Sequence, residues 1–273
     1  MITTQELAKR FEKFFINSQK KDETSAEEFD IKIPYKNLAK IWGGFETGNC
    51  YTFFGKECNN ALDVFRINLL WQLARNNTPV HILEGGDLFE RDFESLVMLQ
   101  SKVSTYKLKT KFITREQSKD VLEGIKVAST LPIAWHTDVL PDEEELWRGE
   151  GFKYPATLPL VCAMNLSLED WHLRAEFLWD KAQNRNRILL LFVQLPRSSE
   201  GPYSPEEPFD FYDVYLPDLI ILPENLCSHM GYIRPHYRGG MYILHTKETE
   251  SLINRECYFD RQSIESPLEE KEL

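Results

Sequence analysis

The chain has 273 residues, 42% of them hydrophobic, so it is long enough to form one large α/β domain with an appendage. Its formal net charge of −11 disfavours a protein whose affinity comes from neutralising nucleic-acid phosphates, and we expect weak or no binding to single-stranded DNA. Its five cysteines are odd in number and contain no C-x-x-C pair, which indicates neither a disulfide framework nor a zinc site.

Two further features bear on localisation. No apolar run approaches the length of a transmembrane span, and residues 1–15 contain charges throughout, unlike a signal peptide. Together with the unpaired cysteines, these features predict a cytoplasmic protein that does not bind membranes.

Residues 1–30 are predicted to form an N-terminal helix and a linker. Thr3 or Thr4 can cap a helix that extends to about Ser18 and has one apolar face, and the polar run 19–30 follows it. The apolar face has to be covered, either by the domain of the same chain or by another protein.

The segment 33–74 has the order of elements of a phosphate-binding loop: a turn with several glycines, an apolar strand at 50–54, a loop that opens at Gly55 and a long apolar helix. In such a loop, backbone N–H groups surround the phosphate, a lysine neutralises it, and a Ser or Thr hydroxyl binds magnesium. Here the positions of the second glycine, the lysine and the hydroxyl residue are occupied by Asn60, Ala61 and Leu62. The frame is kept, and the side chains that bind nucleotide are missing.

Strand and helix patterns alternate through the rest of the domain, which we place at residues 31–260. Strands are predicted at 50–54, 79–83, 131–135, 158–164, 188–193 and 219–222. Helices are predicted from about Asn60, at 87–102, after the capping box at 114–117, and after a cap formed by Ser167 with Asp170. Because successive strands joined by helices pair in parallel, we expect a mostly parallel sheet with helices on both faces and 188–193 as a central strand.

Four charged segments complete the pattern. The acidic run 142–145 points around a helix axis, which predicts a solvated helix start rather than a metal site. The loop 197–217 combines aromatic residues with acids that repel phosphate, so we expect a protein-contact surface, with a surface loop without a partner as the alternative. The residues around 234–238 form the only basic cluster that we identify, and the acidic end, 261–273, is predicted to be a disordered tail.

Three segments resemble the RecA-type motor domain of DnaB-type replicative helicases. Residues 43–55, GGFETGNCYTFFG, are similar to the lead-in to that family's phosphate loop. Residues 167–196 resemble its helix and strand with the magnesium-side carboxylate, but Leu191 occupies the position of the Asp. Residues 234–244 resemble its basic hairpin, with Arg238 at the arginine-finger position and His236 in place of a lysine. The resemblance implies a RecA-like three-layer sandwich.

The resemblance also implies roles for two other parts of the chain. The family's helix before the motor domain docks on the next subunit of a ring, so the N-terminal helix is a candidate assembly arm. Glu84 falls near the family's water-activating glutamate. Without the lysine, the hydroxyl and the Asp, Glu84 has no nucleotide chemistry to serve.

The sequence therefore predicts a catalytically inactive RecA-fold relative of a replicative helicase that acts as a binding or assembly module in DNA replication and uses no cofactor. Its candidate partners are a replicative helicase or a second copy of this chain. The vestigial nucleotide site would consist of Gly55, Lys56, Asn60, Ala61, Leu62 and Arg238.

The alternative is a nucleotide-binding ATPase or switch that binds ATP and magnesium through backbone contacts and Lys56. An unrelated hydrolase is disfavoured, because the sequence contains no G-x-S-x-G or H-E-x-x-H pattern.

Overall fold

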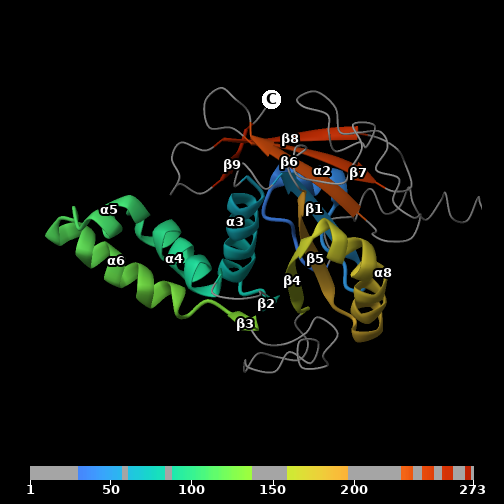
Figure 1. The fold of residues 1–273 in the computed structure, drawn as a ribbon, viewed down its shortest axis with the longest axis horizontal. Helices are drawn as coiled ribbons and strands as arrows, with labels where there is room; N and C mark the ends of the chain where they lie inside the picture. The colour runs from blue at the N-terminus through green and yellow to red at the C-terminus, as the bar shows by residue number, and fades with distance from the viewer. Residues whose placement is uncertain are drawn as a thin grey trace, which may run out of the picture.

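The protein is built on one nine-stranded sheet with the strand order β3-β2-β4-β5-β1-β6-β7-β8-β9 (Figure 1). The computed structural model describes residues 30–56, 61–83, 88–136, 159–195, 229–235, 242–248, 254–260 and 268–271. The predicted N-terminal helix, the acidic run 142–145, the loop 197–217 and the strand 219–222 lie outside these residues.

The first part of the sheet is parallel, as the sequence predicted. All the pairings among its strands are parallel: β1 with β5 and β6, β2 with β3 and β4, and β4 with β5. The strands are β1 (Cys50–Lys56), β2 (Val80–Leu83), β3 (Ile133–His136), β4 (Val161–Ser167), β5 (Ile188–Leu195) and β6 (His229–Pro235). Strand β5 lies between β4 and β1 and is buried on both faces, which confirms the prediction of a central strand.

An antiparallel extension follows β6. It consists of β7 (Tyr242–Glu248), β8 (Asn254–Asp260) and β9 (Glu269–Glu270). The pairing of β6 with β7 is the hairpin expected near the C-terminus, whereas β8 and β9 were not predicted.

The expectation of a disordered tail is wrong for residues 268–271. Leu268 is only 2% exposed, and the N–H of Leu268 donates to Oδ1 of Asn68 at 3.0 Å. The carboxylate of Glu270 accepts hydrogen bonds from the backbone N–H groups of Asn37 at 2.6 Å and Leu38 at 2.9 Å. One apolar residue and one capping carboxylate therefore fix this part of the acidic end against the domain.

Helices cover both faces of the sheet. They are α2 (Lys36–Trp42), α3 (Ala61–Arg75), α4 (Leu88–Ser101), α5 (Thr105–Thr110), α6 (Arg115–Ala128) and α8 (Leu168–Arg185). The predicted caps are confirmed: Thr114 and Gln117 form a capping box at the start of α6, and Ser167 accepts from the N–H of Asp170 at the start of α8. The short helices α2 and α5 were not predicted.

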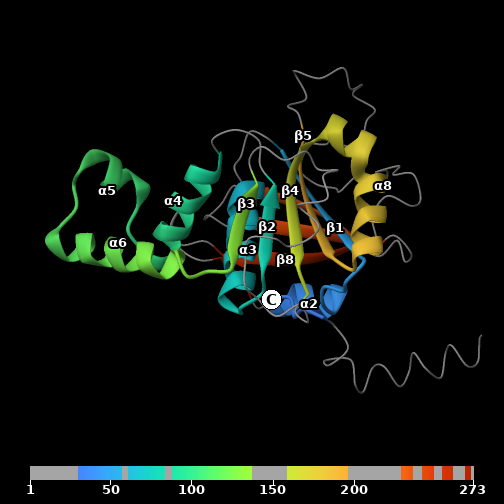
Figure 2. The ribbon, with the colours of Figure 1, turned by 90° about the horizontal axis from the view of Figure 1, so that it is seen from below.

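The two sheet faces form separate cores. Alternate residues of β5, among them Leu190 and Phe192, pack on one side with α3 and α4, which we call the α3 face. The residues between them, among them Leu191 and Val193, pack on the other side with Trp171 of α8, which we call the α8 face. Figure 2 shows α8 on one side of the sheet.

Helices α4, α5 and α6 extend away from the sheet at its β3 edge, and we call them the helical arm (Figures 1 and 2). Helix α6 crosses α4 closely at Gly124, where an added Cβ would lie 3.1 Å from the carbonyl oxygen of Val97. The absence of a side chain at Gly124 therefore lets the two helix backbones approach.

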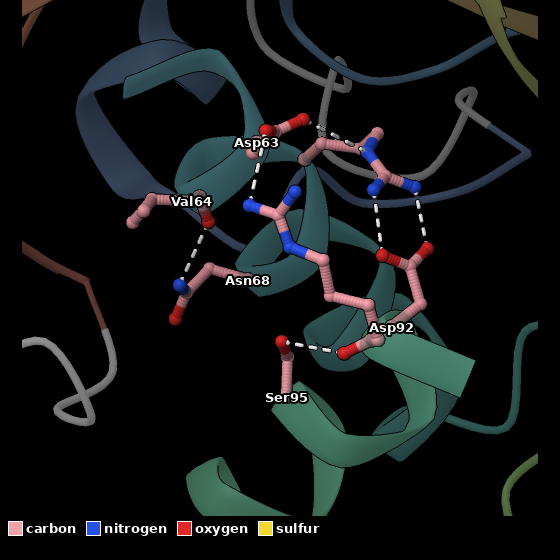
Figure 3. Close-up of polar contacts among 7 residues, drawn as sticks. Asp63, Val64, Asn68, Asp92 and Ser95 are labelled. Carbon is pink, nitrogen blue, oxygen red and sulfur yellow. Dashed lines mark hydrogen bonds and ion pairs between the residues drawn. The ribbon is translucent and has the colours of Figure 1, made fainter. Parts of the chain in front are cut away.

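Helix α3 is buried on nearly all sides, as its apolar sequence predicted, but it also buries two polar residues. Arg66 is 4% exposed and forms a two-pronged ion pair with Asp92 of α4, with N–O distances of 2.6 and 2.7 Å (Figure 3). Asn68 is 3% exposed, and its Nδ2 donates to the carbonyl of Val64 at 2.8 Å (Figure 3). Neither polar residue was predicted to be buried.

Removing one member of the buried ion pair should destabilise the fold strongly. Asp92→Ala leaves the Arg66 charge buried with the partly exposed Asp63, at 4.0 Å, beside it, and should lower the free energy of unfolding by about 3 kcal/mol. The matched control is Arg91→Ala, because Arg91 pairs with Asp63 at 3.6 Å through a side chain that is 59% exposed. That change should cost less than about 1 kcal/mol. Urea unfolding measures both, and equal effects would show that the buried pair has no special role.

Candidate nucleotide site

The candidate site lies at the carboxyl end of β1, where the phosphate-loop frame places it. Strand β1 pairs with β5 on one side and β6 on the other, and helix α3 begins at Ala61. In open parallel sheets, ligands bind at this edge, at the point where the strand order reverses. Strand, loop and helix therefore have the spacing of a phosphate loop.

The contact between Gly55 and Leu62 defines the site. A Cβ added to Gly55 would lie 2.6 Å from the Cβ of Leu62 and 3.4 Å from its Cγ. The first turn of α3 therefore presses an aliphatic side chain directly against the end of β1. In a working loop this glycine allows the backbone to approach phosphate, whereas here it allows the backbone to approach leucine.

The residues at the lysine and hydroxyl positions belong to the core. Ala61 is 0% exposed and Leu62 is 4% exposed, and both pack on the α3 face with Phe53 and Phe65. An aliphatic side chain offers no oxygen ligand to magnesium and no charge to phosphate. These two positions do not fit a magnesium nucleotide.

Leu191 does not line the same space as Leu62, which corrects one expectation. We expected both leucines to occupy the place of the magnesium ligands. Leu191 is 0% exposed and packs on the α8 face, whereas Leu62 packs on the α3 face. The physical reason is that β5 is buried on both faces, so alternate residues along it enter different cores.

The residue of β5 that pairs with Gly55 is Gln194. Gln194 is exposed, although the rest of β5 is buried, and it also pairs with Ser167 at the end of β4. The Ser167 hydroxyl is used to cap α8. Gln194 is thus a polar residue beside Gly55 that was not predicted as part of the site. Its position follows from the parallel register between β5 and β1.

The remaining predicted site residues are only partly placed. Lys56 ends β1, so its backbone lies beside Gly55, but its side chain is not described. Asn60, Glu84, His236 and Arg238 lie outside the described residues. The structure therefore brings together Gly55, Ala61, Leu62 and the backbone of Lys56. The role of Arg238 stays a prediction.

Two histidines on the sheet, His81 buried and His229 half-buried, have shifted pKa values, and neither is next to Gly55 in the strand register. Burial lowers the pKa of His81 to about 4, with further contributions from His136 and Arg187. Nδ1 of His81 lies 2.9 Å from Nε2 of His136 on the neighbouring strand. Burial also lowers the pKa of His229 to about 4, and its ring stacks on Tyr51 with centroids 4.7 Å apart. Both histidines are therefore neutral at pH 7 and serve packing.

The described part of the chain shows neither a metal centre nor a membrane span. No group of three or more His, Cys, Asp or Glu side chains there is arranged to hold a metal ion. No helix among the described residues is both long enough and apolar enough to span a membrane.

Solved structures of helicase ATPase domains are similar to this chain. One ATPase domain matches with a TM-score of 0.71 at 10% sequence identity, over 96% of this chain and 98% of that one. A DnaB-like replicative helicase, studied with its interactions with primase, matches with a TM-score of 0.69 at 11% identity over 93% of this chain. This chain spans 65% of that helicase chain.

No protein-family model matches the sequence, and no curated protein sequence matches it. At identities of 10% and 11% the structural likeness shows the fold alone. That fold is RecA-like, of the kind found in DnaB-like helicases, as the sequence predicted.

The contact between Gly55 and Leu62 gives a direct test of the site geometry. Gly55→Ala should lower the free energy of unfolding by about 1–3 kcal/mol, because the new methyl group overlaps the Cβ of Leu62. In a Leu62→Gly background that Cβ is absent, so Gly55→Ala should cost clearly less. A double-mutant cycle by urea unfolding measures the coupling. Equal costs in the two backgrounds would mean that α3 does not press against β1 in this way.

Proposed function

We propose that this chain is a catalytically inactive RecA-fold relative of a replicative helicase, acting as a binding or assembly module in DNA replication. The observation that supports the proposal most strongly is the burial of Leu62 against Gly55, with an added Cβ only 2.6 Å from the leucine. At this contact Leu62 places a hydrocarbon side chain at the position where a phosphate loop has the hydroxyl that binds magnesium.

The chemistry of phosphoryl transfer supports the loss of activity. The protein's part in that reaction is to position the phosphates and to stabilise charge with a lysine and magnesium. Ala61 and Leu62 supply neither charge nor oxygen ligands. A single backbone amide near Gly55 could attract phosphate, but metal-assisted hydrolysis would lack its metal ion.

Helix α8 offers a surface for a protein partner. Its inner side, including Trp171 and Leu178, is buried, whereas Leu173 is 74% exposed and Phe177 is 45% exposed on its outer side. Leu173 and Phe177 are four residues apart and thus neighbours on the helix surface. An exposed apolar pair of this kind favours contact with a protein, and the candidate partners are a replicative helicase or a second copy of this chain.

The alternative function is an ATPase or switch with a non-standard phosphate loop. The observation that favours it is the kept frame, in which β1 ends at Lys56 beside β5 and α3 begins at Ala61. In this case Lys56 would supply the charge that Ala61 cannot.

The two functions differ in their response to ATP. We expect ATP with magnesium to leave the thermal unfolding midpoint unchanged and no magnesium-dependent release of phosphate. A ligand that binds only the folded state at ~100 times its dissociation constant would stabilise the protein by about 2.7 kcal/mol, a shift that is easily measured. Turnover that requires magnesium and disappears in Lys56→Ala would establish the alternative.

The assembly function predicts that α8 contributes to association. We expect sedimentation equilibrium to show self-association or binding to a purified replicative helicase, weakened at least about tenfold by Leu173→Ser with Phe177→Ser, because the pair loses its apolar contact. The matched control is Leu122→Ser with Ile125→Ser, since these α6 residues are 66% and 41% exposed but lie on the helical arm. A monomer that binds no helicase, or equal effects of the two double variants, would contradict the assignment to α8.

A further inference from the structure

We propose that helix α5 and the turns that flank it, residues 102–115, bind single-stranded nucleic acid. We call the exposed side of this segment the α5 face. It lies on the helical arm, away from the carboxyl end of β1 (Figures 1 and 2), and the inference therefore does not depend on the nucleotide site.

The first observation is local charge. The segment KVSTYKLKTKFITR contains five basic residues and no acidic residue, within a chain whose formal net charge is −11. The basic residues are Lys102, Lys107, Lys109, Lys111 and Arg115. Affinity for a phosphate chain depends on the cations that the chain touches, so this segment can attract nucleic acid although the whole protein is acidic.

The second observation is that most of these cations are exposed and available. Lys109 lies 3.9 Å from the carboxylate of Glu94 on α4 and is partly neutralised. Lys102, Lys107, Lys111 and Arg115 are exposed, and among the residues that the structure describes no carboxylate lies within 4 Å of them. Few carboxylates of the protein itself would therefore compete with phosphate groups for these cations.

The third observation is a pair of exposed aromatic rings among the cations. Tyr106 is 71% exposed and Phe112 is 77% exposed, and each is adjacent in sequence to a lysine. Rings next to cations are the arrangement by which proteins bind single strands, because bases stack on the rings while phosphates contact the cations. An acidic peptide would use the lysines but would leave the ring faces without planar partners.

The fourth observation is the backbone at two lysines of the segment, Lys102 directly after α4 and Lys111 directly after α5. Lys102 and Lys111 have φ angles of 57° and 59°, in the left-handed region that favours glycine or asparagine. A lysine there costs about 1 kcal/mol relative to a residue that adopts this region easily. Each lysine follows the end of a helix, where the helix dipole favours a positive charge, so both folding and the binding of phosphate favour lysine at these positions.

The α5 face is also held in place. Leu108 packs against the main core, and the hydroxyl of Ser104 accepts from the N–H of Lys107 at the start of α5. Helix α6 is fixed to α4 at Gly124. Binding would therefore require little ordering of the protein, which preserves the affinity gained from stacking and charge.

Two expectations from the sequence change as a result. Net charge predicted weak or no nucleic-acid binding, and the residues around 234–238 were expected to be the only basic cluster. The second expectation is wrong, because residues 102–115 form a larger cluster. The cluster is visible in the sequence itself, whereas the short helix α5, with Lys107 and Lys109, was not predicted.

The experiment is fluorescence anisotropy of labelled oligo(dT) of roughly 16 nucleotides, titrated with the full chain across a salt series from about 50 mM. We expect binding that weakens with salt. Lys107→Gln with Lys111→Gly should reduce the salt slope by ~0.7 for each phosphate that the protein no longer neutralises. Tyr106→Ala with Phe112→Ala should weaken binding about tenfold or more without changing the slope.

Controls separate this proposal from general charge effects and from misfolding. Lys32→Gln with Lys40→Gln removes the same charge from exposed positions off the helical arm and should leave binding unchanged. Lys111→Gly relieves a positive φ, so the thermal midpoint should not fall. The proposal is overturned if the native chain shows no salt-dependent binding, or if polyglutamate competes as well as oligo(dT) and the two ring substitutions have no effect.

Discussion

The structure depends on one constraint, which is that helix α3 has almost no side that faces water. Its apolar residues contact the sheet and α4, so any polar atom on it has to find a partner inside the protein. Arg66 finds Asp92 on α4, and Asn68 finds the N–H of Leu268, which is 200 residues away in sequence. These contacts tie α3 to the base of the helical arm and to the C-terminal end. The buried polar atoms thus fix which segments meet, and the apolar surface provides most of the driving force.

The same burial accounts for the state of the candidate site. The first turn of α3 is pressed so close to β1 that Leu62 covers Gly55. In a phosphate loop this turn presents its N–H groups and polar side chains to a ligand, so the strand end stays open to solvent. With Ala61 and Leu62 in that turn, closing the gap gains apolar contact and excludes water. The aliphatic side chain of Leu62 therefore packs against the end of β1 and at the same time leaves the hydroxyl position without an oxygen ligand for magnesium.

The parts of the fold that the sequence predicts are those with local signals. Apolar runs located most of the parallel strands, and Thr114 and Ser167 located the starts of α6 and α8 through hydrogen bonds within three residues. The parts that were missed depend on distant residues. Helix α2 is capped by Glu270, 232 residues from Leu38, and strand β9 is held through Asn68. The sequence placed Leu191 on the correct strand but on the same face as Leu62, whereas it packs on the opposite face. A strand that is buried on both sides shows no alternation of polarity, so its sequence does not tell which residues face which core. For the candidate site, the kept frame and the missing ligands could be predicted from sequence, but the Gly55–Leu62 contact and the position of Gln194 required the three-dimensional register.

The net charge of the whole chain does not describe the charge of each part of its surface. The formal charge of −11 describes the potential far from the protein, but a bound strand responds to cations within about 8 Å at physiological ionic strength. In the α5 segment Lys107, Lys109 and Lys111 lie between the exposed Tyr106 and Phe112 in the sequence, and the acidic residues of α6 begin only at Glu116. A distant negative charge then lowers the rate of encounter more than it lowers the affinity of the bound state. The helical arm is built from helices that pack on one another, and its outer surface takes no part in the contact that closes the phosphate-loop frame. The contact between Gly55 and Leu62 at the end of β1 therefore places no physical restriction on what the helical arm can bind.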